Sequence, residues 1–139
     1  MLMPGETELH RILAGLQPVL APETYVFCSI AQASYGVLAN TTPLASVQEP
    51  EGLTLVLPQE QADQNGLSYE GVFRCIRLDV HSSLESVGLT AAVSTTLAQA
   101  HISANMFAGM HHDLILVPSH CAQAALEALQ HLSQSNPLD

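Results

Sequence analysis

A short apolar run followed by a proline and then by a helical pattern occurs twice in this chain of 139 residues. The first copy covers residues 53–60 (LTLVLPQE) and the second covers residues 113–120 (DLILVPSH). When Pro58 is aligned with Pro118, the strand patterns that open the two halves also fall into rough correspondence, which indicates an internal repeat. The chain is therefore expected to fold as two related α+β units, with the order α-β-loop-β-β-α in the first half and β-α-β-β-α in the second.

The first half opens with apolar residues at every third or fourth position, which predicts a helix over residues 6–16. Pro18 and Pro22 forbid a long continuation of this helix, and β-branched and aromatic residues predict a strand over 25–30. Residues 31–42 show no clear periodicity and are expected to form a loop. The remaining elements predicted for this half are a weak strand over 43–47, a strand over 53–57 and a short helix over 59–64.

The second half has clearer periodicity. Between residues 73 and 80, Ile76 and Leu78 share one face while Arg77 and Asp79 share the other, which predicts a half-buried strand. In the rest of this half, segments with apolar residues at helical spacing alternate with continuous apolar runs, which are typical of strands. The other predicted elements are a helix over 89–100, a strand over 102–108, a central strand over 114–117 and a helix over 122–132 with Ser119 as its N-cap.

The charge balance excludes two classes of partner. The chain has three arginines, no lysine and 13 acidic residues, which gives a formal net charge of −10. Nucleic acids and anionic membrane surfaces are held by basic patches, which this chain cannot assemble. We therefore expect neither nucleic-acid binding nor membrane binding.

The cysteines and the length of the apolar runs indicate the cellular compartment of the protein. Cys28, Cys75 and Cys121 are widely spaced without a C-x-x-C pair, which favours small buried apolar side chains in a reducing compartment. No apolar run approaches the roughly 20 residues of a membrane span, and charged residues interrupt the N-terminus where a signal peptide would be apolar. We expect a cytoplasmic protein, and no cofactor motif is present.

The second half resembles an ACT domain, the ferredoxin-like β-α-β-β-α unit of amino-acid-sensing regulators. The order and spacing of the matching segments carry the resemblance. These segments are the strand at 73–80 and residues 87–90 (VGLT), 97–105 (LAQAHISAN) and 112–118 (HDLILVP).

The whole chain is similar to stand-alone tandem ACT proteins of bacteria and to the regulatory ACT pair of aspartate kinases. The segments that support this match are residues 25–29 (YVFCS), 51–57 (EGLTLVL) and 78–93 (LDVHSSLESVGLTAAV). The resemblance implies an α+β fold of two ferredoxin-like (ACT) units, the first with its helix moved to the N-terminus and a loop where that helix belongs. The implied boundaries are an N-terminal ACT-like unit at 1–68, a C-terminal ACT unit at 69–134 and a disordered tail at 135–139.

The segment between the strand at 73–80 and the following helix is the first candidate site. A helix N-terminus offers unpaired amide donors and a partial positive charge, and Gly88 would let a ligand approach the backbone closely. In ACT domains the ligand commonly lies by this loop, against a neighbouring unit. A capping box formed by Ser82 and Glu85 is the alternative explanation of the same residues. The candidate ligand-binding residues here are His81, Ser82, Ser83, Leu84, Val87, Gly88, Leu89 and Thr90.

The second candidate lies directly before the central strand of the second half. Asp113 could accept a ligand ammonium group beside His112, or it could be a turn residue that bonds to its own backbone. His81, His112 and Asp113 could also converge as three ligands of a metal ion, although no metal motif with helical spacing is present. No metal is therefore assigned.

Three functions follow from these observations. The first is a small regulatory module that binds an amino acid or a similar small metabolite at the interface of two ACT units and signals to an unidentified protein partner. The second is a structural or protein-interaction dimer that binds no ligand. The third is a small metal-dependent enzyme. We expect the first, with no catalytic residues and with a homodimer formed through open sheet edges.

Overall fold

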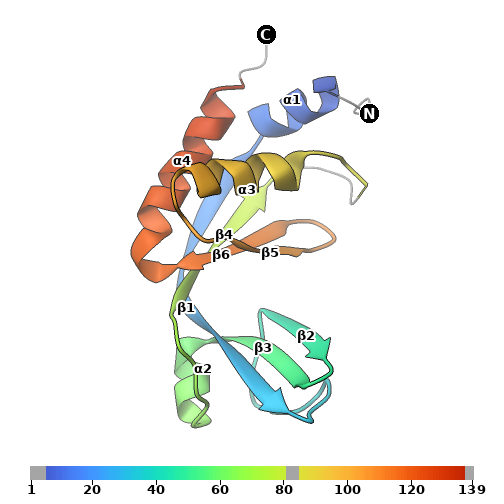
Figure 1. The fold of residues 1–139 in the computed structure, drawn as a ribbon, viewed down its shortest axis with the longest axis vertical. Helices are drawn as coiled ribbons and strands as arrows, with labels where there is room; N and C mark the ends of the chain where they lie inside the picture. The colour runs from blue at the N-terminus through green and yellow to red at the C-terminus, as the bar shows by residue number, and fades with distance from the viewer. Residues whose placement is uncertain (1–5, 81–84, 137–139) are drawn as a thin grey trace. The chain divides into compact units, whose positions relative to one another are not determined.

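The computed structural model describes residues 6–80 and 85–136 (Figure 1). Contacts divide the chain into two compact units. Unit 1 consists of Met1–Ala21 and Cys75–Asp139, and unit 2 consists of Pro22–Arg74. The repeat boundaries expected from the sequence are a different division of the chain, and they stay predictions.

Unit 1 is a sheet covered on one side by three helices, α1, α3 and α4, which contact one another (Figure 1). Its strands follow the order β1-β4-β6-β5, and the strand β1, Gln17–Ala31, continues into unit 2. The other elements are α1 Glu6–Ala14, β4 Phe73–Asp79, α3 Leu89–Gln99, β5 Asn105–Ala108, β6 Asp113–Pro118, the 3-10 turn Ser119–Cys121 and α4 Ala122–Gln134.

The alternation of apolar and polar side chains along β4 explains which side of this sheet the helices cover. Ile76 and Leu78 on β4 and Ile115 and Val117 on β6 belong to one buried apolar cluster with residues of all three helices. The intervening Arg77 therefore points to the opposite side of the sheet. The helix predicted at the N-terminus is present, and its buried residues, Ile12 and Leu13, pack in the same cluster.

Unit 2 is a smaller sheet in the order β2-β3-β1, made by β2 Ala45–Glu49, β3 Gly52–Pro58 and the second part of β1. The helix α2, Gln59–Gln64, contacts β3 and contributes Ala62 to a buried cluster with Leu53 and Leu55. Gly52 has φ +144°, and a Cβ there would lie 2.2 Å from the Ile30 carbonyl oxygen, so the β2–β3 hairpin requires glycine at this position.

The structure confirms an α+β fold in which strands and helices follow the predicted order, and it corrects several boundaries. β1 begins at Gln17 and contains Pro18 and Pro22, which precede the stretch paired with β3, Tyr25–Ala31, so their missing amide protons remove no bond to β3. The N-cap of α4 is Cys121 and not Ser119. Of the predicted disordered tail, Ser135 and Asn136 donate side-chain hydrogen bonds to carbonyl oxygens of α4, and the rest lies outside the described residues.

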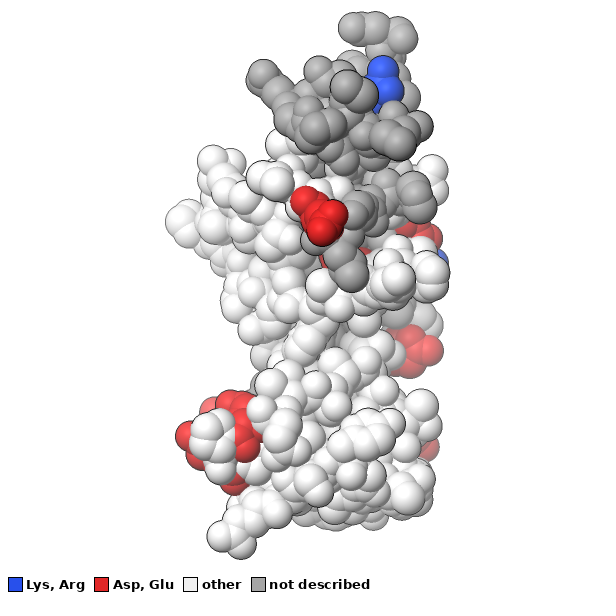
Figure 2. Space-filling view, turned by 90° about the vertical axis from the view of Figure 1, so that its right-hand side faces the viewer, with Lys and Arg blue, Asp and Glu red and all other residues white. Residues whose placement is uncertain are grey.

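The surface reflects the acidic composition. Figure 2 shows one face on which most of the described atoms belong to uncharged residues and carboxylates form separate patches. In the described part of the chain, no helix combines the length and the apolar character that a membrane span needs.

Candidate functional site

The helix α3 begins directly after Gly88, which is its N-cap. Gly88 has φ 106° and ψ −19°, a backbone conformation that favours glycine, and among the described residues no side chain caps the helix. Gly88 holds the N-cap position of α3, and Ser82 of the predicted capping box lies outside the described residues. The first-turn amides of an α-helix have no partner within the helix, so this end of α3 can accept an anionic group.

One side of Gly88 is occupied by the N-terminal helix. A Cβ at Gly88 would lie 2.9 Å from Cδ2 of Leu9, which means that α1 covers the glycine closely. A ligand could therefore approach the start of α3 only from a direction that Leu9 leaves open. The role expected of Gly88 from the sequence was to let a ligand approach closely, and nothing in the sequence indicated that Leu9 would lie against it.

The predicted residues around Gly88 have different surroundings. Val87 is 85% exposed and Thr90 is also exposed, so both side chains are accessible to a ligand. Leu89 is 5% exposed and packs in the core of unit 1. The candidates His81, Ser82, Ser83 and Leu84 lie outside the described residues.

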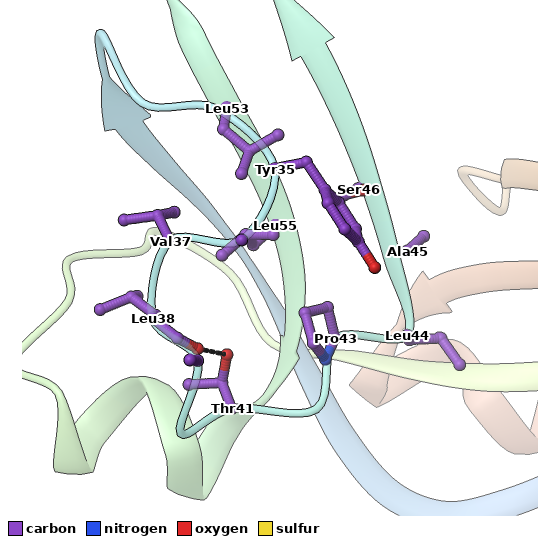
Figure 3. A pocket seen from close by; sticks show the side chains of 12 residues that line it. Tyr35, Val37, Leu38, Thr41, Pro43, Leu44, Ala45, Ser46, Leu53 and Leu55 are labelled. Atoms are coloured by element: carbon purple, nitrogen blue, oxygen red, sulfur yellow. Dashed lines mark hydrogen bonds between the residues drawn. The ribbon is translucent and has the colours of Figure 1, made fainter.

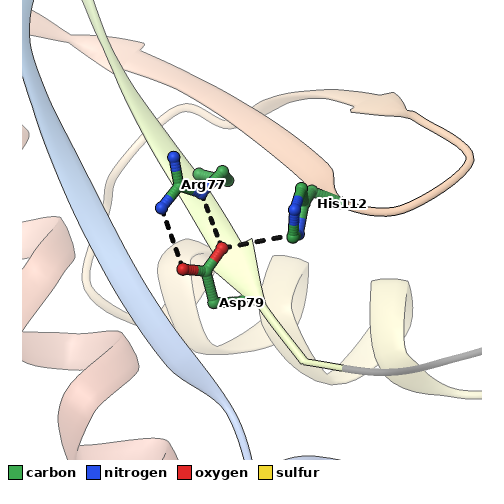
Figure 4. Close-up of polar contacts among 3 residues, drawn as sticks. All are labelled: Arg77, Asp79 and His112. Atoms are coloured by element: carbon green, nitrogen blue, oxygen red, sulfur yellow. Dashed lines mark hydrogen bonds and ion pairs between the residues drawn. The ribbon is translucent and has the colours of Figure 1, made fainter.

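A polar cluster lies where β4 ends, immediately before the 81–90 segment (Figure 4). Arg77 donates to Asp79 through two parallel bonds, Nε to Oδ1 at 2.6 Å and Nη2 to Oδ2 at 2.9 Å. His112, which precedes β6, places its Nδ1 3.4 Å from Asp79 Oδ1. The hydrogen bonds and charge of Arg77 hold the pKa of the Asp79 carboxyl below its usual range, and the charge of His112 acts in the same direction. The carboxylate of Asp79 is therefore ionised near neutral pH.

This cluster can bind both charged groups of a zwitterion. The side chains of Arg77 and His112 are about half exposed, so both are accessible to a ligand. A guanidinium and an imidazole can donate to a carboxylate, while Asp79 can accept from an ammonium group. Neither Arg77 nor Asp79 is among the candidate residues predicted from the sequence, which indicated only that they share one face of a half-buried strand.

Asp113 does not join this cluster. It alternates with Ile115 and Val117, which face the helices, whereas His112 reaches Asp79 on the other side of the sheet. Burial raises the pKa of the Asp113 carboxyl. The two neighbouring candidates are therefore separated by the sheet. Within the described ranges, no three His, Cys, Asp or Glu side chains form a group that could hold a metal ion, and His81 lies outside those ranges.

A pocket of about 430 Å³ lies in unit 2, where residues 32–44 pass over the sheet without forming a helix (Figure 3). Leu53 and Leu55 of β3 line it from the sheet, and Val37 and Leu38 line it from the loop. Tyr35 lies at its mouth with 88% of its surface exposed. The sequence analysis predicted the loop but missed the pocket. The adjacent large apolar residues Val37 and Leu38, in a segment without helical or strand periodicity, were the sequence feature that could have indicated it.

Two family models match the chain, and both have the same description. A family model described as ACT domain matches residues 4–74, and a second model with the same description matches residues 70–131. No curated protein matches the chain.

Solved structures show the same arrangement of elements. A protein of unknown function from Vibrio cholerae, described as a possible transport protein, is 45% identical, with a TM-score of 0.83 over 91% of this chain and 96% of that one. A protein from Agrobacterium tumefaciens is 13% identical, with a TM-score of 0.71 over 85% of this chain and 89% of that one. The ligand-free regulatory subunit of aspartate kinase from Thermus thermophilus is 11% identical, with a TM-score of 0.64 over 83% of this chain and 95% of that one. At these identities, the last two show a shared fold.

Proposed function

The chain belongs to the ACT domain family as two tandem ACT domains, and from this premise we propose that it is a regulatory module that binds an amino acid or a similar small metabolite. ACT domains are regulatory units, and the fold shared with the regulatory subunit of aspartate kinase agrees with this role. The proposal assigns no catalytic residue. It also places the protein in the cytoplasm, in agreement with the free thiols of its three cysteines.

The polar cluster at the end of β4 is the observation that carries the proposal. Arg77 is one of only three basic residues besides histidine in the chain, and it is held against Asp79 beside His112. We assign the α-carboxylate of the ligand to Arg77 and His112, and its ammonium group to Asp79. Val87, Gly88 and Thr90 would then border the ligand, as the sequence predicts.

A thermal-shift screen over the standard amino acids and related metabolites tests this assignment. A ligand at 100 times its Kd stabilises the folded state by about 2.7 kcal/mol, which gives a clear rise in melting temperature. In His112→Ala, we expect the affinity for the same compound, measured by titration calorimetry, to fall about tenfold because one charge-assisted hydrogen bond is lost.

His111→Ala is the matched control, since His111 is the exposed neighbouring histidine and is no member of the cluster. Its affinity should equal that of the natural sequence. A flat thermal response to every compound at millimolar concentration would overturn the proposal, as would equal losses in the two histidine variants.

A structural role as a dimer is the second candidate, because β2 is an edge strand with most of its residues exposed. Val47 on this strand is an exposed large apolar residue, 42% accessible, which suits pairing with another strand. Light scattering on the purified protein distinguishes a homodimer from a monomer. A dimer that responds to no small molecule would favour this second function.

A further inference from the structure

We propose that the pocket of unit 2 is a second ligand site, which takes an uncharged and mainly apolar small molecule. This site is separate from the polar cluster in its residues and in the chemistry of its ligand. Its volume of about 430 Å³ lies within the range of ordinary small-molecule pockets.

The pocket exists because a helix is missing. In unit 1, α3 follows β4 and packs on the sheet, whereas in unit 2 the strand β1 is followed by the loop at 32–44. A loop fills less volume than a helix, and the pocket lies between this loop and β3, where Leu53 and Leu55 form its floor although each is only 2% exposed. Figure 3 shows these two side chains directed from β3 toward the loop.

The loop is held in a defined conformation that keeps the pocket open. Leu38 has φ 57°, which is rare for a bulky residue, and its carbonyl oxygen accepts bonds from both the amide and the hydroxyl of Thr41. Further bonds tie the loop to its surroundings: the amide of Thr42 donates to Gln61 Oε1, the amide of Leu44 donates to the Val56 oxygen, and Gln48 Nε2 donates to the Ala33 oxygen. A preformed pocket loses little conformational entropy on binding.

The lining determines the class of ligand. None of the residues that line the pocket carries a formal charge, so an α-carboxylate or a phosphate would find no cation there. Unit 2 has one basic residue and an excess of acidic ones, which also disfavours an anion. The acidic residues are Glu23, Glu49, Glu51, Glu60, Asp63 and Glu70, and the basic one is Arg74. The hydroxyls of Tyr35 and Ser46 can bond a single polar group of an otherwise apolar molecule.

The probe for the experiment is N-phenyl-1-naphthylamine, an uncharged dye whose fluorescence rises in apolar surroundings. Its matched anion is 1-anilinonaphthalene-8-sulfonate, which has the same ring system with an added sulfonate. We expect saturable binding of the uncharged dye to the full chain and at least about tenfold weaker binding of the sulfonate.

Two substitutions on one strand show where the dye binds. Ser46 pairs with Leu55 and shares its face of the sheet, so Ser46→Phe fills the pocket, whereas Val47 pairs with Thr54 on the other face. We expect Ser46→Phe to weaken binding of the uncharged dye about tenfold and Val47→Phe to leave it unchanged. His112→Ala should also leave it unchanged, which separates this result from that of the amino-acid site.

Methyl NMR of the natural sequence provides an independent readout if Ser46→Phe folds poorly. The dye should shift the methyl resonances of Leu38, Leu53 and Leu55. The proposal is overturned if the uncharged dye does not saturate, if these methyls do not shift, or if folded Ser46→Phe binds like Val47→Phe. Equal affinity for the sulfonate would overturn the assigned ligand class.

Discussion

Asp79 and Asp113 are two carboxylates near the same end of the sheet in unit 1, and their surroundings act on them in opposite directions. Hydrogen bonds from Arg77 favour the ionised form of Asp79, which lowers its pKa, whereas burial disfavours the ionised form of Asp113, which raises its pKa. Asp79 is thus prepared to act as a charged ligand-binding group. Asp113 costs stability when it is ionised.

The pH dependence of stability should reveal this contrast. The folded pKa of Asp79 is depressed, so its contribution is present above its ordinary pKa and is lost as the pH falls through the folded value. Asp79→Asn should therefore lower the melting temperature at neutral pH, and the difference should vanish in acid.

For Asp113 the sign is reversed, because its folded pKa is raised and its ionisation is unfavourable above that value. Asp113→Asn should raise the melting temperature at neutral pH, and this gain should disappear below the ordinary pKa of aspartate. Melting curves of both variants from acid to neutral pH make the comparison. Shifts of the same sign at neutral pH would contradict the account.

At the scale of elements, the strands and helices with regular periodicity were predictable and the irregular ones were not. The helix α2 was predicted with the observed bounds, Gln59–Gln64, because Pro58 and Asn65-Gly66 mark its ends. The early part of β1 was missed because two prolines argue against a strand. The pocket of unit 2 was missed because local sequence does not show how far a loop stands above a sheet.

The N-terminal helix is an element whose contribution to stability can be measured directly. Ile12 is 2% exposed in the core of unit 1, so Ile12→Ala should reduce the free energy of unfolding by about 2–5 kcal/mol. Arg11 is the exposed neighbour on the same helix and serves as the control. Arg11→Ala should change the free energy of unfolding by less than about 0.5 kcal/mol. Urea denaturation measures both variants. Equal effects would mean that α1 does not pack on the unit as described.

At the scale of the whole molecule, two consecutive family matches fold into two units that are not consecutive in the chain. Residues of unit 1 come from both ends of the sequence, because the start of β1 lies beside β4 and α1 packs with α3 and α4. The repeat in the sequence predicted two ACT units, which is confirmed by the family matches. The repeat could not predict that α1 and the start of β1 belong to the same unit as the second half of the chain. Contacts between segments that are distant in the sequence leave no local pattern.

The candidate ligand site was predictable only in part for the same reason. Gly88 and His112 could be named as candidates from the sequence, because glycine before a helix and polar residues before a central strand are local features, and their role in binding stays a prediction. The ion pair of Arg77 and Asp79 with His112 depends on the neighbouring positions of β4 and β6 in the sheet. The homodimer and the protein partner stay predictions.

An NMR titration of the isotope-labelled protein with the amino acid that gives the largest thermal shift tests the central proposal most directly, because it reports binding and its location together. We predict saturable shifts of the backbone amides of Gly88, Leu89, Thr90 and His112 and of the side-chain Nε of Arg77, while the amides of the unit 2 loop at 32–44 stay unchanged. Saturable shifts confined to other parts of the chain, or no shifts at millimolar ligand, would contradict the proposal that this end of β4 is an amino-acid site.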